Sequence, residues 1–144
     1  MHPLHQSKIF YLYIIINMDK LLLDIQKKPS FGNGFVYLLC CVDKFKIGIT
    51  KNSIAKRIQE LQTGNSEEIW CRDYVECPLN ILKDIEKAMH FRHHQTNIKN
   101  EWFDLSADDV SNFKQQVNKY IFVYHNITKM AGLESGLFPN LNTV

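Results

Sequence analysis

The sequence has 144 residues, of which 45% are hydrophobic and 22% are charged. This composition is that of a single globular domain, and the chain is too short for two domains of ordinary size. A formal net charge of only +2 excludes a polycation that binds nucleic acid with its whole surface. Any affinity for nucleic acid therefore requires a local basic patch.

Residues 1–33 are predicted to form an extension before the domain. Ile9 to Ile16 is an almost continuous apolar run. A membrane-spanning helix needs about 20 apolar residues, and no cleavage pattern of small residues follows the run. The sequence therefore predicts no membrane partner. A second methionine, Met18, opens the more ordinary stretch MDKLLLDIQKK, and our hypothesis is that translation starts there.

The domain itself is predicted over residues 34–125. The stretch GFVYLLCCVDKFKIGIT, Gly34 to Thr50, contains two β-prone runs separated by Asp43-Lys44, which indicates a hairpin. Glycine weakens a strand interior, so Gly48 within FKIGIT marks a place where another group comes close to the backbone. A helix follows in NSIAKRIQELQTGN, with Asn52 or Ser53 as its N-cap and Gly64-Asn65 as its stop.

The second half of the domain repeats this alternation. EEIWCRDYVEC predicts a third strand, and Pro78 ends it and opens a helix with a buried apolar stripe. NEWFDL reads as a short extended segment in which we expect Phe103 in the core and Trp102 partly exposed, because neighbours on a strand point oppositely. A capping box at Ser106 begins the last helix. Residues 126–144, rich in Gly, Asn and Pro towards the end, are predicted to be a loose tail.

The four cysteines form no metal-binding or disulfide pattern. Cys40 and Cys41 are adjacent, Cys71 and Cys77 lie far from them, and there is no C-x-x-C pair. We expect four buried, reduced thiols and no zinc. This pattern indicates an intracellular reducing compartment, the cytoplasm or nucleus of the host cell.

The predicted fold is of the α+β class. It is a small, mainly antiparallel sheet of three to four strands, flanked by helices in the order strand, strand, helix, strand, helix, strand, helix. Several polar side chains lie beside the apolar stripes of these elements: Arg57 on the first helix, and Glu86 and His90 on the second. Tyr37 and Lys46 could project from one face of the hairpin. Taken singly, each also fits a structural role, such as an ion pair between Arg57 and Glu86.

Together these residues resemble the GIY-YIG nuclease superfamily. Gly34-Phe35-Val36-Tyr37 and Lys46-Ile47-Gly48 resemble its paired strand motifs. The chain is most similar to a divergent bacteriophage-type DNA-binding branch, named after a phage T-five open reading frame. The similarity spans about residues 34–105 and includes KIGIT, LQTGN, a glutamate and a histidine four residues apart, and EWF.

The resemblance implies a site that acts on DNA. Tyr37, Lys46, Arg57 and His90 would be catalytic, and Glu86 would bind one divalent ion, Mg²⁺ or Mn²⁺. The nucleic-acid-binding residues would be Gly48, Lys51, Lys56, Asn65 and Trp102. No small-molecule cofactor is implied, and a partner protein is a candidate source of specificity.

Two positions depart from the superfamily pattern. Lys46 replaces the tyrosine of the second strand motif, as is typical of the phage-type branch, and Leu61 stands where many members have histidine. Three interpretations follow. The protein is a metal-dependent endonuclease, a DNA-binding module that does not cut, or an interaction domain in which Arg57 and Glu86 form a structural pair.

Overall fold

The computed structural model describes residues 3–137 and confirms the α+β class. Five antiparallel strands form one sheet in the order β3-β1-β2-β5-β4. The strands are β1 Asn33–Cys41, β2 Lys44–Thr50, β3 Trp70–Pro78, β4 Asn97–Lys99 and β5 Trp102–Phe103. The helices are α1 Pro3–Asp24, α2 Ile54–Gln62, α3 Leu82–Arg92, α4 Ala107–Ser111 and α5 Phe113–Leu137, with a 3₁₀ turn, η1, at His94–Thr96.

The sheet has more strands than predicted, because β4 has no sequence signature of a strand. Its three residues are all exposed, so no alternation of apolar and polar residues marks them. The predicted hairpin of β1 and β2 is confirmed, but its turn is Val42-Asp43, not Asp43-Lys44. Tyr37 lies opposite Gly48 and Leu39 opposite Lys46. Tyr37 and Lys46 therefore project from the same face of the hairpin.

The turn residue Val42 adopts a backbone conformation that suits glycine. Its φ angle is +58°, in the left-handed region where a β-branched side chain is strained, and its side chain is exposed. We expect Val42→Gly to raise the free energy of unfolding by about 1 kcal/mol, because the substitution removes this strain. Chemical denaturation measures the change. A matched Val42→Ala variant keeps the Cβ atom and should gain much less, so equal effects of the two substitutions would contradict strain as the cause.

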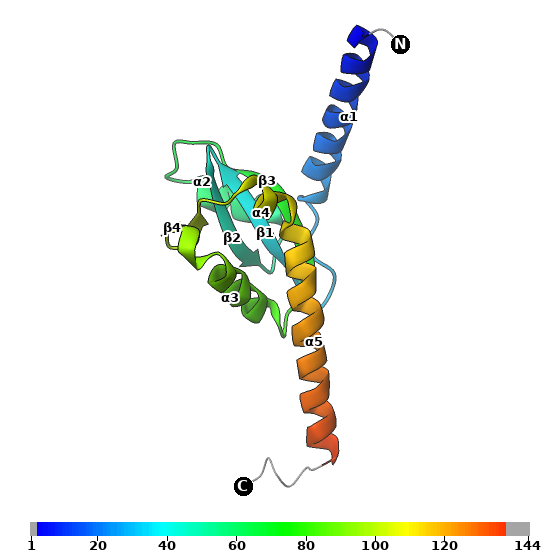
Figure 1. Ribbon diagram of the computed structural model, residues 1–144, viewed down its shortest axis with the longest axis vertical. Coiled ribbons are helices and arrows are strands. Elements are labelled where there is room, and N and C mark those ends of the chain that lie inside the picture. The colour runs from blue at the N-terminus through cyan, green and yellow to red at the C-terminus, as the bar shows by residue number, and fades with distance from the viewer. Residues whose placement is uncertain (1–2, 138–144) are drawn as a thin grey trace.

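Two hydrophobic layers cover the two faces of the sheet. On one face, α2 and Ile25, which follows α1, pack against Tyr37 and Leu39. On the other face, α3, α4 and α5 pack against Val36 and Leu38. Figure 1 shows α3 and α5 on the near side of the strands, with α2 behind them. The alternating residues of β1 therefore face different helices, as the pleat of a strand requires.

Predicted capping residues act at the helix starts. The Ser53 hydroxyl accepts a hydrogen bond from the Lys56 N–H at the start of α2. The Ser106 hydroxyl does the same for the Asp109 N–H at the start of α4. The final predicted helix is in fact two, because Asn112 separates α4 from α5.

Both ends of the described chain are more helical than predicted. α1 occupies most of the predicted N-terminal extension, with Met18 inside it. The predicted loose tail is wrong as far as Leu137, since α5 continues to that residue and Gly132, one unfavourable residue, does not end it. The rest of the predicted tail lies outside the described residues. In Figure 1 the two long helices project from opposite ends of the domain. Within residues 3–137, no helix combines the length and hydropathy needed to cross a bilayer.

The predicted burial of the four cysteines and the predicted positions of Phe103 and Trp102 are confirmed. Each of the four cysteines is free and buried, and burial raises the pKa of the Cys71 thiol to about 12. Phe103 is 1% exposed, whereas Trp102 is partly exposed. Phe103 contributes to the layer under α3 and α5, and Trp102 to the layer under α2.

Candidate functional site

Tyr37 and Gly48 form a cross-strand pair at the floor of the candidate site. A Cβ atom at Gly48 would lie 2.4 Å from the Tyr37 hydroxyl oxygen and 2.6 Å from the ring atom Cζ. The Tyr37 ring, 1% exposed, thus covers the backbone of Gly48. Gly48 was predicted to let nucleic acid approach. The group that approaches its backbone is the Tyr37 ring.

Arg57 reaches this tyrosine from α2. Its Nε–H donates to the Tyr37 hydroxyl over 3.4 Å, and its Nη1 lies 3.1 Å from a Glu60 carboxylate oxygen. Burial raises the pKa of Tyr37, and the hydrogen bond from Arg57 only partly offsets this effect. Tyr37 therefore keeps its proton at neutral pH, which makes it a poor general base. Its O–H is free to act as a hydrogen-bond donor.

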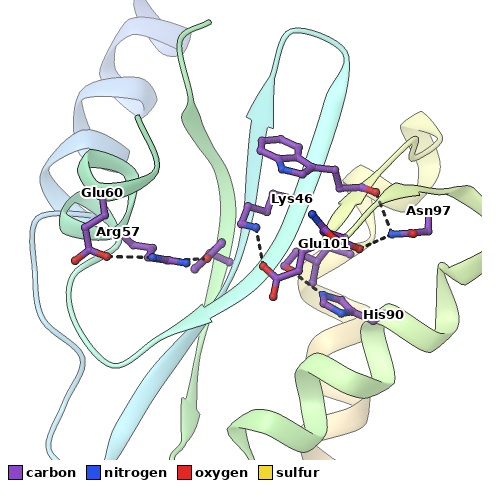
Figure 2. Close-up of polar contacts among 10 residues, drawn as sticks. Lys46, Arg57, Glu60, His90, Asn97 and Glu101 are labelled. Atoms are coloured by element: carbon purple, nitrogen blue, oxygen red, sulfur yellow. Dashed lines mark hydrogen bonds and ion pairs between the residues drawn. The ribbon is translucent and has the colours of Figure 1, made fainter. Parts of the chain in front are cut away.

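Lys46 lies on the same face as Tyr37 and is almost fully buried. Its Nζ contacts a Glu101 carboxylate oxygen at 2.6 Å and lies 5.6 Å from the centre of the Trp102 ring. The lysine side chain is 8% exposed and that of Glu101 37%. Figure 2 shows this pair between Arg57 and His90. Glu101 is the charged partner of Lys46 and fixes the position of its Nζ.

The second part of the site comes from α3 and the loop before β5. A possible metal-binding group consists of Glu86, His90 and Glu101. Each residue offers one ligand atom, and the three atoms lie within 4.8 Å of one another. His90 Nε2 is 2.7 Å from the Ile47 carbonyl oxygen. A carbonyl oxygen only accepts, so Nε2 carries a proton. In a neutral imidazole, Nδ1 then has a free lone pair.

The open edge of β2 brings the two parts together. Strand β5 pairs with β2 only at Phe45 and Lys46. The Ile47 N–H instead donates to the Glu101 carbonyl oxygen, and the Ile47 carbonyl oxygen accepts from the His90 ring. Groups from both faces of the sheet therefore meet around this edge.

The electrostatics connect both parts of the site. Burial raises the pKa of Glu86, and the nearby negative charge of Glu101 raises it further, whereas His90 and Lys46 lower it. The negative charges of Glu101 and Glu86 also raise the pKa of Tyr37. Two carboxylates that repel each other at this distance favour a bound cation.

The remaining predicted DNA-binding residues are spread over several parts of the domain. Lys51 and Lys56 are exposed, at the end of β2 and on α2. Asn65 and Trp102 line a hollow of about 440 Å³ at the turn end of the hairpin. The structure shows where these side chains lie, and their contacts with DNA remain predictions.

One of the three interpretations included an ion pair between Arg57 and Glu86. In the described part of the chain Arg57 pairs with Glu60 instead. Residue Glu101 was missed as a site residue, although it is the first letter of the EWF motif. Its role depends on the return of the chain to β2, which spacing in the sequence does not show.

Comparison with known proteins gives one match. The comparisons with curated proteins and with solved structures found no match. A family model described as the T5orf172 domain matches residues 11–118, three quarters of the chain. This range contains α2, α3, all five strands and every residue of the candidate site. The chain therefore belongs to the T5orf172 domain family.

Proposed function

We propose that the protein is a divalent-metal-dependent endonuclease of the GIY-YIG type that cleaves phosphodiester bonds in DNA. The observation that carries this proposal is the cluster of Glu86, His90 and Glu101 next to the Tyr37–Arg57 pair. Family membership is compatible with a protein that acts on DNA. DNA as the substrate, and a partner protein as a source of specificity, are parts of the proposal.

The donor set fits a divalent ion. Two carboxylates suit Mg²⁺ and Mn²⁺, which prefer oxygen ligands, and an imidazole nitrogen is more typical of transition metals. Glu86, Glu101 and Nδ1 of His90 would hold the ion, with the His90 ring oriented by the Ile47 carbonyl. The mixed set favours Mn²⁺ over Mg²⁺. A bound ion would supply positive charge to a phosphate oxygen during cleavage.

The other residues of the site supply complementary functions. Arg57 places a cation, 35% exposed, where it can contact a phosphate. The buried Tyr37 hydroxyl accepts the hydrogen bond from Arg57 Nε and so holds the guanidinium in place. Because Tyr37 keeps its proton, it is not the base for the attacking water. The proposed ion would instead lower the pKa of a water molecule bound to it.

A DNA-binding module that does not cut is the second candidate function. The observation in its favour is Lys46, whose charge is already satisfied by Glu101 at 2.6 Å. A lysine in such a pair offers less charge to the transition state of phosphate transfer. Both functions use the same basic groups, so only an assay of turnover separates them.

The test is cleavage of plasmid and of branched DNA by purified protein with Mn²⁺, with Mg²⁺ and with a chelator. We expect nicking with either ion, faster with Mn²⁺, and none with the chelator. Arg57→Ala should reduce the rate at least about 100-fold, as loss of a group that stabilises transition-state charge does. Arg72→Ala, which removes an exposed arginine of β3 outside the site, is the matched control. DNA binding without cleavage under every condition would establish the second candidate function instead.

A further inference from the structure

Helix α1 presents an apolar surface to solvent. Ten large apolar side chains between Ile9 and Leu23 are exposed by 51% to 68%. No charged residue lies between Lys8 and Asp19. A helix that is apolar on all sides is normally covered by other protein or by lipid. Among the side chains of α1 that the structure describes, Leu21 at the C-terminal end packs on the hydrophobic core.

A groove lies beside this end of α1. Its volume is about 550 Å³, and it is lined by Met18 and Leu22 of α1, Ile58 of α2 and Ile69 and Trp70 near the start of β3. Trp70 is 50% exposed. The lining is mainly apolar, so the groove suits an apolar side-chain row of a helix.

One row of α1 side chains continues directly from the groove. Tyr11, Ile15, Met18 and Leu22 recur at spacings of four, three and four residues, the spacing of a coiled-coil seam. Each of the four is more than half exposed. Met18 and Leu22 line the groove, so the N-terminal half of the same row, Tyr11 and Ile15, extends beyond it.

We propose that α1 pairs antiparallel with α1 of a second copy of this chain. In a two-fold arrangement, Tyr11 of one chain lies opposite Leu22 of the other, and Ile15 opposite Met18. The N-terminal half of each helix then fills the groove at the base of its partner. An isologous pair of this kind closes on itself, because each copy offers both halves of the contact.

Charge agrees with this arrangement. The same register brings Lys8 next to Asp24 of the second copy, so opposite charges meet at both ends of the seam. The contact is made by this row and the groove that it fills, not by the whole circumference of α1, and together they must supply the ~800 Å² that each partner buries in a stable interface.

Sedimentation of the full chain tests the dimer. We expect twice the chain mass of 16.9 kDa at micromolar concentration. Ile15→Glu should give the monomer, because it places two like charges in the seam. Tyr13→Glu, on the opposite side of α1 and equally accessible, is the matched control and should remain dimeric. A wild-type monomer, or equal effects of the two variants, would overturn the proposal.

Cysteine crosslinking tests the direction of the pair. The native cysteines are buried, so we expect only the introduced cysteines to form interchain disulfides. Two copies of Tyr11→Cys lie about 16 Å apart along an antiparallel pair, too far for a disulfide. The same holds for Leu22→Cys alone, whereas the double variant Tyr11→Cys/Leu22→Cys should form interchain disulfides. Crosslinking of each single variant would mean parallel helices and overturn the proposal, as would binding of wild-type monomer to lipid vesicles without dimerisation.

Discussion

Glu86→Gln is expected to reduce metal-dependent DNA cleavage at least about 100-fold while leaving the folded protein at least as stable as the wild type. The substitution keeps the size of the side chain and removes a ligand of the proposed ion. It also removes a carboxylate that Glu101 repels. Cleavage rates with Mn²⁺ and thermal unfolding without divalent ions measure the two effects separately.

The pH dependence of stability gives a second readout for Glu86. Its pKa in the folded protein is raised above the ordinary value. The folded state therefore binds a proton more tightly than the unfolded state, and stability falls as pH rises from the unfolded pKa through the raised folded pKa. Glu86→Gln should remove this part of the fall. A variant that unfolds more easily at neutral pH would contradict the proposed arrangement.

Asp84→Asn is the control for Glu86→Gln. Asp84 is a carboxylate of the same helix, two residues away, and so projects from a different side. We expect cleavage by Asp84→Asn at close to the wild-type rate. Equal losses in both variants would show a general effect of negative charge on α3 and not a role for Glu86.

Gly48→Ala is expected to destabilise the protein by about 1–3 kcal/mol and to displace the Tyr37 ring. The new Cβ would overlap the ring at its hydroxyl and at Cζ, and the ring is buried with no space to move into. Displacement also breaks the hydrogen bond from Arg57. Denaturant unfolding measures the first effect, and the cleavage assay measures the second.

Two further variants show whether the Tyr37 ring is the cause. Gly132→Ala, on an exposed position of α5 with no atom near its added Cβ, should stabilise the protein, because alanine favours a helix. In a Tyr37→Leu background, Gly48→Ala should cost much less than in the wild type. An equal cost in both backgrounds would mean that the strand itself, and not the ring, requires glycine.

The parts of the fold that have strong local patterns were predicted from the sequence. The two β-prone runs of β1 and β2 predicted the hairpin. The helical spacing of Ile54, Ile58 and Leu61 predicted α2. The turn was displaced by one residue because Val42, a poor turn former, adopts a positive φ there. The apolar run in helix α1 has no polar face. A run without helical or alternating periodicity predicts neither a surface helix nor a strand, so α1 was not predicted.

The candidate site was predicted in part. Tyr37, Lys46 and Arg57 are residues of local motifs, and the register of the hairpin explains why the first two share a face. Glu101 was not predicted, because its contact with Lys46 joins residues 55 positions apart. The alternative of an ion pair between Arg57 and Glu86 fails for the same reason. Local spacing places both residues beside apolar stripes, but their helices lie on opposite faces of the sheet.

The contacts at the open edge of β2 also affect the order in which the site folds. Tyr37 and Arg57 are 20 residues apart, Ile47 and His90 are 43 apart, and Lys46 and Glu101 are 55 apart. Closing the longest of these loops costs about 1 kcal/mol more chain entropy than closing the shortest. We expect the tyrosine–arginine part to assemble first and the carboxylate part last. A partly folded chain would then present an anion-binding surface before it has a place for a metal ion.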